Sequence, residues 1–360
     1  MAERIHVSDL PITSNRKAFL LLLIMVFLLG SCQSSQMVVD APTRVDSDLI
    51  PDGMSVEEAN TLAGLQRVDD YPLYTMVYLA EYPDLEMAGT PLTEDFGLQD
   101  WACSLFAAYG DPDEMLFGRN FDWDFSPGLL LFTDPEEGYA SVSMVDLYYL
   151  GYGHEQAYGL TDLPLEDLAG LLDAPYLPFD GMNEAGLAVG MAAVPDGGMV
   201  PDPDKETVDS LMVIRKILDG AATIEEAEEI IRAYNIDWGS GPTLHYLVAE
   251  ASGRSALIEF SRGEIHLLEN QDPWQAATNF LVSEAWTNPA THCWRYGVIS
   301  ERLKESGGRI GARGAMDLLE DVSQESTQWS VIYRIGAREV WITMGRDYQS
   351  VHQFEFEPGK

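Results

Sequence analysis

The sequence predicts an α+β protein in which helices cover two stacked β-sheets, a four-layer αββα sandwich. Three observations predict this class. Short apolar runs ended by turn residues fill residues 103–194, two amphipathic helical patterns follow one another over 207–234, and strand and helix patterns then alternate to residue 356. Helices with one broad apolar face need a sheet to cover, and 46% hydrophobic residues can form a core between such layers.

Acidic residues dominate the charge of the chain. Asp and Glu number 59 against 21 Lys and Arg, which gives a formal net charge of -38. A protein that binds nucleic acid needs Lys and Arg to replace the counterions of the phosphates, so the composition argues against such a partner. The charge indicates a well-solvated exterior instead.

Residues 1–32 are typical of a secretory signal. Arg16 and Lys17 precede an apolar run of about a dozen residues, which is too short for a full membrane span. The Leu-Gly-Ser-Cys ending at Cys32 resembles a bacterial lipoprotein box, whose cysteine is lipid-modified after cleavage. An uncleaved N-terminal anchor is the alternative. Both predict an exported protein of the bacterial cell envelope or the extracellular space, held at the membrane only by this segment or its lipid.

The segment that follows is expected to be a linker that leads into a partly structured region. Residues 33–56 are polar and show no periodic pattern. Residues 57–100 include an apolar run up to Leu79 that can add a strand, and they end in a polar stretch just before Cys103.

A strand, a tight turn and a returning strand are predicted between Cys103 and Trp123. Residues 110–113, Gly-Asp-Pro-Asp, favour a bend, and apolar runs flank them. A hairpin of this length brings Arg119 and Asp122 back beside Cys103. A cationic neighbour lowers the pKa of a thiol, and a carboxylate can orient an amine or an imidazole. The plainer alternative is a buried cysteine next to an ordinary ion pair.

The remaining elements follow along the chain. Strands are predicted at the apolar runs 128–132, 139–147 and 186–194, with a short helix and cleft-lining loops at 160–176. A helix is predicted over 207–218, and a capping box from Thr223 to Glu226 opens a second one. The sheet that they cover is expected from the hairpin 243–250 and 255–260, continued by 265–268 and 277–282. Two further helices at 294–304 and 313–322 precede closing strands at 330–335, 340–344 and 351–356.

Cys103 and Cys293 are the two cysteines beyond the signal segment. A disulfide between them can form in an oxidising compartment, but it would consume the candidate nucleophile. We interpret Cys293, beside Trp294, as a packed core thiol.

Two motifs resemble the choloylglycine hydrolase and penicillin V acylase family, also called linear amide C-N hydrolases. They are Cys103 with the arginine of Gly-Arg-Asn-Phe-Asp-Trp sixteen residues later, and Asp-Gly-Met-Asn-Glu-Ala-Gly-Leu at 180–187. The resemblance has acid ceramidase-like features and covers about 71–356. It implies the αββα fold of the N-terminal-nucleophile hydrolases, a catalytic domain over 103–360, and a linker and propeptide over 33–102 that is severed before Cys103.

The resemblance also implies the roles of the site residues. Asn279 matches the asparagine that helps form an oxyanion hole, and Arg295 lies where acid ceramidase-like members carry a second arginine. Cys103 is then the nucleophile, and its freed α-amine, with a reference pKa of about 7.7 to 8.0, is the general base. Arg119 lowers the pKa of the thiol, Asp122 holds the amine and Arg295 braces the site. The same thiol starts self-cleavage.

One position departs from the family. Bile-salt hydrolases carry a second oxyanion asparagine some ten residues after the Met-Asn-Glu asparagine, and here that place is Ala192-Ala193-Val194. Either another donor completes the hole or the substrate differs. The departure weakens a bile-salt or penicillin substrate but leaves the enzyme class unchanged.

These features predict a self-processing cysteine amidohydrolase that cleaves a linear C–N amide bond of a small N-acyl substrate without a cofactor. The Tyr and Leu content of residues 147–158 favours an apolar acyl group. One alternative is an acyltransferase of the same fold. The other is a non-catalytic surface lipoprotein, whose aromatic residues between 123 and 152 would bind an apolar ligand.

The histidines offer a rival catalytic scheme. His154, His245 or His292 can partner Cys103 as in a papain-like protease, because such a pair is recognised by geometry rather than by chain order. His245 occupies an internal strand position and is better interpreted as a core histidine. The spacings of metal sites and phosphate-binding loops are not found in the sequence, so we expect neither a metal nor a phosphate cradle.

Overall fold

The computed structural model describes residues 36–37, 44–82, 102–195, 197–239, 241–285 and 288–358, and the chain from Gln36 onward forms one compact unit. The expected signal segment with Cys32, and the end of the expected propeptide over 83–101, lie outside the described residues. Within the described ranges, no helix combines the length and the apolar character that a membrane crossing requires.

One large sheet has seven strands in the order β1-β18-β17-β16-β5-β4-β15. Their bounds are β1 (Gln36–Met37), β18 (His352–Glu355), β17 (Glu339–Met344), β16 (Thr327–Arg334), β5 (Leu116–Asp122), β4 (Ala102–Ala108) and β15 (Trp274–Ala277). Its pairs are antiparallel except that of β1 with β18. The predicted hairpin is confirmed, because β4 pairs with β5 and sets Ala102 opposite Asp122 and Cys103 opposite Phe121.

The second large sheet has nine strands in the order β14-β13-β12-β9-β8-β7-β6-β3-β2. Their bounds are β14 (Glu264–Glu269), β13 (Ser255–Ser261), β12 (Thr243–Glu250), β9 (Leu187–Val194), β8 (Pro178–Asn183), β7 (Ser141–Asp146), β6 (Gly128–Thr133), β3 (Leu73–Tyr78) and β2 (Gln66–Asp69). β3 runs parallel to β6, so residues before Cys103 complete one end of this sheet. Two short strands, β10 (Thr207–Asp209) and β11 (Asn235–Asp237), pair separately.

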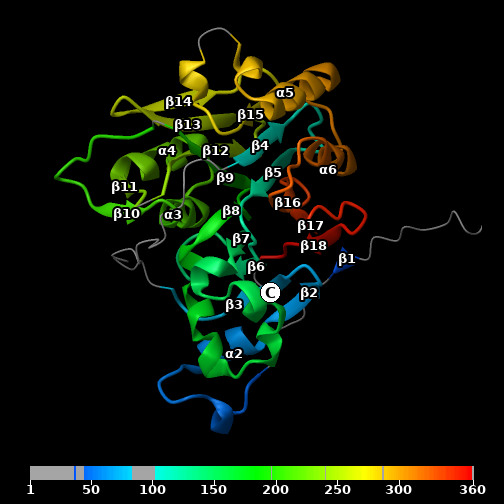
Figure 1. Ribbon diagram of the computed structural model, residues 1–360. Helices are drawn as coiled ribbons and strands as arrows, with labels where there is room; N and C mark the ends of the chain where they lie inside the picture. Colours follow the sequence, from blue (N-terminus) through cyan, green and yellow to red (C-terminus); the bar gives the residue numbers. More distant parts are fainter. Residues whose placement is uncertain are drawn as a thin grey trace, which may run out of the picture. The chain divides into compact units, whose positions relative to one another are not determined.

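Helices lie on the outer face of each sheet, which gives the predicted four layers (Figure 1). Helices α5 and α6 pack on β4, β5, β15 and β16, whereas α3 and α4 pack on β8, β9, β12 and β13. The α-helices are α2 (Val56–Ala63), α3 (Met212–Gly220), α4 (Ile224–Ala233), α5 (Trp294–Ser306) and α6 (Ala312–Asp321). The 3-10 segments are η1 (Ser47–Leu49), η2 (Leu147–Leu150), η3 (His154–Tyr158), η4 (Leu160–Asp162), η5 (Leu165–Tyr176), η6 (Val282–Glu284) and η7 (Pro289–Thr291).

Alternation along β4 divides its side chains between two cores. Cys103, Leu105 and Ala107 belong to the core between the sheets, whereas Phe106 and Ala108 belong to the core under α5 and α6. Successive side chains of a strand point to opposite faces, so the register of β4 decides that Cys103 faces the inter-sheet space.

The predicted start of one helix and one predicted strand are wrong. The helix predicted over 207–218 begins at Met212, because residues 207–209 form β10 and the Asp209 carboxylate accepts the Leu211 N–H at 2.7 Å. The predicted strand 277–282 is not one, because β15 ends at Ala277 and lies beside β4 in the other sheet.

Strand β8 and helix α2 were not predicted from the sequence. The eight residues of α2 follow a capping box, in which the Ser55 hydroxyl accepts the Glu58 N–H and the Glu58 carboxylate accepts the Ser55 N–H. That local signal was present in the sequence, within residues expected to form the polar linker and the start of the strand-containing segment.

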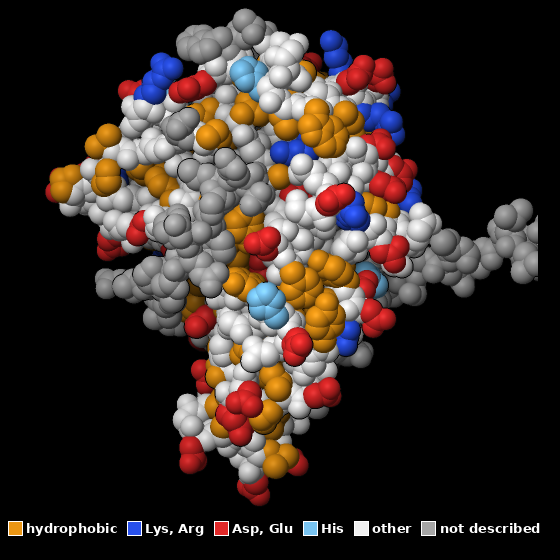
Figure 2. Space-filling view, viewed as in Figure 1, with side chains coloured by type: hydrophobic (Ala, Val, Ile, Leu, Met, Phe, Trp, Pro, Cys, Tyr) orange, Lys and Arg blue, Asp and Glu red, His pale blue; other side chains and the backbone are white. Residues whose placement is uncertain are grey.

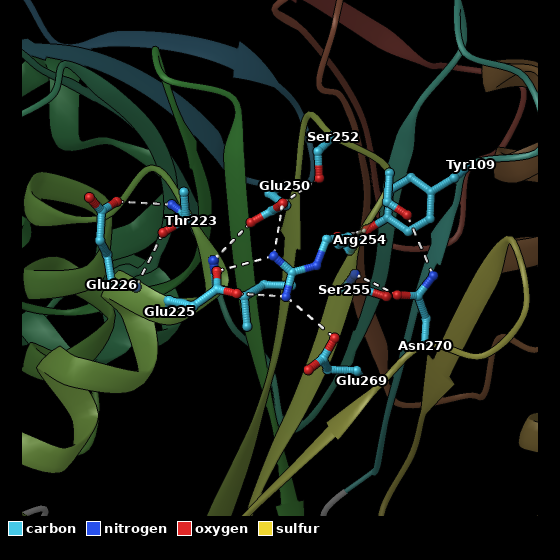
Figure 3. Close-up of polar contacts among 12 residues, drawn as sticks. Tyr109, Thr223, Glu225, Glu226, Glu250, Ser252, Arg254, Ser255, Glu269 and Asn270 are labelled. Atoms are coloured by element: carbon cyan, nitrogen blue, oxygen red, sulfur yellow. Dashed lines mark hydrogen bonds and ion pairs between the residues drawn. The ribbon is translucent and has the colours of Figure 1, made fainter.

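An arginine joins α4 to the β12–β13 hairpin (Figure 3). Arg254 donates to both carboxylate oxygens of Glu225 at 2.8 and 3.1 Å and to Glu269 at 3.3 Å, and the Glu250 carboxylate accepts the Ile224 N–H at the start of α4. Glu225 and Glu269 are exposed and Arg254 is partly buried, so these ion pairs contribute little to the stability of the fold. Acidic side chains are spread over the face in Figure 2, as the net charge predicts.

The two sheets meet closely at Gly190. A Cβ added to this residue of β9 would lie 3.0 Å from Leu105 Cδ2 and 3.0 Å from Phe117 Cζ of the opposite sheet. We therefore expect Gly190→Val to lower the free energy of unfolding by about 1–3 kcal/mol, because overpacking forces the sheets apart. Urea unfolding measures this loss, with Gly336→Val as the control, since nothing lies within 4 Å of a Cβ added there. Equal losses in both variants would contradict close contact of the sheets.

Candidate active site

The structure brings together the five residues that the sequence assigned to the site. Cys103 lies near the start of β4, Arg119 and Asp122 lie in β5, Asn279 follows β15, and Arg295 is in the first turn of α5. Because β15 pairs with β4 and α5 packs against both strands, residues 176 positions apart in the chain meet at one end of the hairpin.

Arg295 and Asn279 hold the backbone of the candidate nucleophile. The Cys103 N–H donates to Asn279 Oδ1 at 2.7 Å, and Arg295 Nη2 donates to the same oxygen at 2.9 Å. Arg295 Nη1 donates to the Cys103 carbonyl and to Ser104 Oγ, and it lies 3.7 Å from Asp122 Oδ2. The planar guanidinium has five N–H donors in fixed directions, which suits it to fixing several groups at once.

Arg119 faces the thiol and is completely buried. Its Nη2 lies 3.8 Å from Cys103 Sγ, while Nη1 donates to the Phe179 carbonyl at 3.1 Å and to the Asp180 carboxylate. The Tyr333 hydroxyl donates to the other oxygen of Asp180 at 2.5 Å. Asp180 therefore supplies the counter-charge that a buried guanidinium needs. Asp180 opens the motif 180–187, but the motif alone did not predict a role for this residue in the site.

In the continuous chain, the surroundings of the Cys103 thiol disfavour the thiolate. Burial raises the pKa of Cys103, and the Arg119 guanidinium only partly opposes that effect. The Cys103 nitrogen is here an amide whose N–H is donated to Asn279, so it cannot accept the thiol proton as a free amine would.

Two residues that the sequence analysis missed hold the Asp122 carboxylate. Thr327 Oγ1 donates to Asp122 Oδ1 at 2.5 Å and Gln324 Nε2 donates to Oδ2 at 2.9 Å. Burial raises the pKa of Asp122, and these two hydrogen bonds and Arg295 oppose the rise. Both partners lie more than 200 positions away in the chain, so no local spacing could reveal them.

Asn279 also contacts the position where the sequence departs from the family. Its Nδ2 donates to the Ala193 carbonyl at 2.8 Å. An amide nitrogen carries two N–H groups, so this contact orients Asn279 and leaves its second N–H to be directed elsewhere. At the position of the expected second asparagine, the backbone carbonyl of Ala193 therefore orients Asn279.

The histidines of the rival scheme have other neighbours. His245 Nδ1 lies 3.3 Å from Glu259 Oε1, and the Glu259 carboxylate also accepts the N–H groups of Val282 and Ser283, just after Asn279. The His292 ring stacks on Phe280. His154 packs edge-on against Tyr148.

The cysteines and the candidate metal ligands of the described residues complete the description of the site. Cys103 and Cys293 are both free, and Cys293 is half-buried, so our interpretation of it as a packed core thiol is wrong. It directly precedes the first turn of α5, between the exposed residues His292 and Trp294. Among the described residues, no cluster of three or more His, Cys, Asp and Glu side chains could hold a metal ion.

Asp146, at the end of β7, is a second buried carboxyl group. Burial raises its pKa to about 7, against the opposing hydrogen bonds from Ser126 and the Tyr148 N–H. In the unfolded chain an aspartate titrates near 3.9. Between these two values the folded state holds a proton that the unfolded state releases, so Asp146 destabilises the fold progressively as the pH rises.

We therefore expect Asp146→Asn to gain stability relative to the wild type as the pH rises. The gain should grow by roughly 1.4 kcal/mol per pH unit between about pH 4 and about pH 7, and should level off above that range. Urea unfolding of both proteins at several pH values measures the difference, and comparing the two proteins cancels the effect of the large net charge. A difference that does not vary with pH would contradict the raised pKa.

Comparison with known proteins adds to this geometry. Residues 103–280 match the family model described as linear amide C-N hydrolases, choloylglycine hydrolase family. A variant of the conjugated bile acid hydrolase from Clostridium perfringens aligns with a TM-score of 0.50 and 13% identity, over 70% of this chain and 92% of that chain. A second mutant of that hydrolase aligns with a TM-score of 0.49 and 15% identity, over 71% and 92% of the two chains. Penicillin V acylase from Agrobacterium tumefaciens aligns with a TM-score of 0.46 and 19% identity, over 67% and 83%.

The structural likeness with a TM-score of 0.50 supports the predicted fold. The family match begins at Cys103 and ends one residue after Asn279, so it includes both sequence motifs and the hairpin. The predicted resemblance and enzyme class are confirmed: residues 103–280 match the choloylglycine hydrolase family, and the chain is a hydrolase of linear amide C–N bonds.

Proposed function

We propose that this hydrolase is a self-processing cysteine amidohydrolase with Cys103 as its N-terminal nucleophile. The observation that carries the proposal is the convergence on Cys103, where Arg119 faces the sulfur, Asn279 holds the nitrogen and Asp122 lies opposite the preceding residue. Each of these contacts supports a step of the same chemistry.

Maturation would break the Ala102–Cys103 peptide bond. The Cys103 sulfur attacks the Ala102 carbonyl, the thiol proton passes to the Cys103 nitrogen, and the acyl group moves from nitrogen to sulfur. Water then hydrolyses the thioester, which leaves a carboxylate on Ala102 and a free α-amine and thiol on Cys103. Asn279 Oδ1, which accepts the Cys103 N–H in the continuous chain, and Asp122 would receive the N–H groups of the new amine.

Turnover would use that amine as the base. Its reference pKa of about 7.7 to 8.0 lies close to neutral pH, so it can take the thiol proton directly or through a water molecule. The thiolate attacks the substrate amide, and the second N–H of Asn279 donates to the developing oxyanion, a contact typically worth about 3–4 kcal/mol. The leaving amine collects the proton, and water hydrolyses the thioester.

The substrate class that we propose is a small amide with an apolar acyl group. Aromatic rings near the hairpin support it, because Phe125 stacks on the half-exposed Tyr158 and Tyr149 packs against Phe179 beside Asp180. Acyl transfer to a second amine by the same thioester is the alternative. Export to the cell envelope is proposed on the sequence of residues 1–32.

In Cys103→Ala, residues 102 and 103 should stay joined and the protein should be inactive, because this variant lacks the nucleophile for both self-cleavage and substrate hydrolysis. Cys103→Ser should mature slowly, since a hydroxyl is a weaker nucleophile than a thiolate. Intact mass and N-terminal sequencing detect a new terminus at residue 103. Cys293→Ala, which removes the other free thiol, is the matched control and should mature normally. A wild-type chain in which residues 102 and 103 stay joined would contradict the proposal.

We expect the severed N-terminal piece to stay bound after cleavage. β3 lies between β6 and β2 in the nine-stranded sheet, and Tyr74 and Met76 are completely buried. Release would expose this apolar surface and turn β6 into an open edge. The two pieces should therefore co-elute in size-exclusion chromatography under native conditions and separate in denaturant. Elution of residues 103–360 alone from a native column would contradict this expectation.

A further inference from the structure

We propose that Tyr71, which precedes the cleavage point, is a positioning residue of the mature active site and acts through Gln328. The inference rests on the proposed function, because it assigns to the severed piece a part in the chemistry of Cys103. It concerns the loop 123–127, which connects Asp122 at the end of β5 to β6.

Gln328 occupies an irregular position in β16. The register of β16 against β5 shifts between Thr327, which is opposite Asp122, and Trp329, which is opposite Phe121. Gln328 is thus the extra residue of a bulge, a feature that redirects a side chain out of the regular ladder. It directly follows Thr327, which donates to the Asp122 carboxylate.

The buried side chain of Gln328 makes four hydrogen bonds. Its Oε1 accepts the Tyr71 hydroxyl at 2.6 Å and the Ser126 N–H at 3.0 Å. Its Nε2 donates to the Trp123 carbonyl at 2.6 Å and to the Ser326 carbonyl at 2.8 Å. A side-chain amide has two acceptor lone pairs and two N–H donors, so every hydrogen-bonding position is used. Three of the four partners are backbone groups, and two of these belong to the loop after Asp122.

Tyr71 is the partner that orients this amide from outside the cleaved domain. Its ring packs edge-on against Phe125 of the same loop at 5.6 Å, and the carbonyl of the next residue, Pro72, accepts the Gly128 N–H at 2.8 Å. Burial raises the pKa of Tyr71 to about 12, so its hydroxyl remains a donor at neutral pH.

The rest of the protein leaves a place for this ring. Gly345, after β17, has a φ of +54°, and a Cβ added there would lie 2.6 Å from Tyr71 Cδ2. The Gly345 N–H donates to the backbone carbonyl of Gln328 at 2.8 Å. The residue that makes room for the ring is therefore also bonded to the residue that the ring orients.

A series of contacts thus connects Tyr71 on the severed piece to the α-amine of Cys103, the proposed general base. Tyr71 orients the Gln328 amide, the amide fixes the loop between Trp123 and Ser126, and this loop begins next to Asp122, which is to hold the α-amine of Cys103. Without the Tyr71 hydroxyl, Gln328 loses one of its two acceptor contacts and the loop is less well fixed. The Asp122 carboxylate then stabilises the ammonium form of the α-amine less, and the pKa of that amine falls.

The test compares Tyr71→Phe with Tyr74→Phe in processed, purified protein. Each change removes one hydroxyl from the same piece, and Tyr74 donates instead to the Ala157 carbonyl at 2.7 Å, away from Gln328. The readout is the rate at which iodoacetamide alkylates Cys103 across a range of pH, measured by peptide mass. A fluorogenic N-acyl coumarin amide gives kcat and KM in parallel, and thermal unfolding reports the stability of each variant.

Tyr71→Phe should move the acid limb of the alkylation profile to lower pH and reduce kcat roughly tenfold with little change in KM. Tyr74→Phe should lose similar stability and keep the wild-type profile. Gln328→Glu, which still accepts from Tyr71 but cannot donate to the loop, should reproduce the effect of Tyr71→Phe.

Three outcomes would overturn the inference. Identical profiles for Tyr71→Phe and Tyr74→Phe, in a wild type that is cleaved and active, would overturn the role of Tyr71 and leave the proposed function standing. Failure of Tyr71→Phe alone to mature would assign Tyr71 to processing instead of turnover. A wild type that is never cleaved at 102–103 would overturn both the inference and the proposed function.

Discussion

The antiparallel register of β4 and β5 is the constraint on which the site depends. It sets Ala102 opposite Asp122 and Cys103 opposite Phe121, so the bond that we propose is cut lies beside the carboxylate that is to hold its product amine. A shift of one residue would turn Cys103 towards α5 and α6 and Arg119 away from it. The buried residues of both strands prevent such a shift, because each face has its own core.

Buried charge is the cost of placing this chemistry between two sheets. Arg119, Asp180 and Asp122 are all almost completely buried, and each would be strongly destabilising alone. The structure compensates for them in two connected groups, with Asp180 and Tyr333 on Arg119, and hydroxyl and amide donors with a second arginine on Asp122. Because the groups meet at Cys103, removing one partner would alter the charge around the sulfur as well as the stability of the core.

The sequence predicted the part of the site that is local in the chain. Turn residues and apolar runs placed Arg119 and Asp122 beside Cys103, and family resemblance added Asn279 and Arg295. Local patterns could not predict Thr327, because its contact with Asp122 depends on the pairing of β16 with β5. The strand predicted over 277–282 failed for a related reason. Asn279 leaves the ladder to reach Cys103, and a buried glutamate from β13 holds the N–H groups that follow it.

The residues before Cys103 are bound into the fold by the same pairing that orients the loop after Asp122. β3 pairs with β6 from Leu73 opposite Gly128 onward, and Pro72 extends this ladder to the end of that loop. Tyr71 directly precedes Pro72, beyond the end of the ladder, and its hydroxyl donates to Gln328. Strand pairing therefore fixes the position of the Tyr71 hydroxyl. The cut that we propose at 102–103 would remove the covalent link without changing the strand pairing or the contact with Gln328, so retention of the piece and its positioning of the loop would have one physical cause.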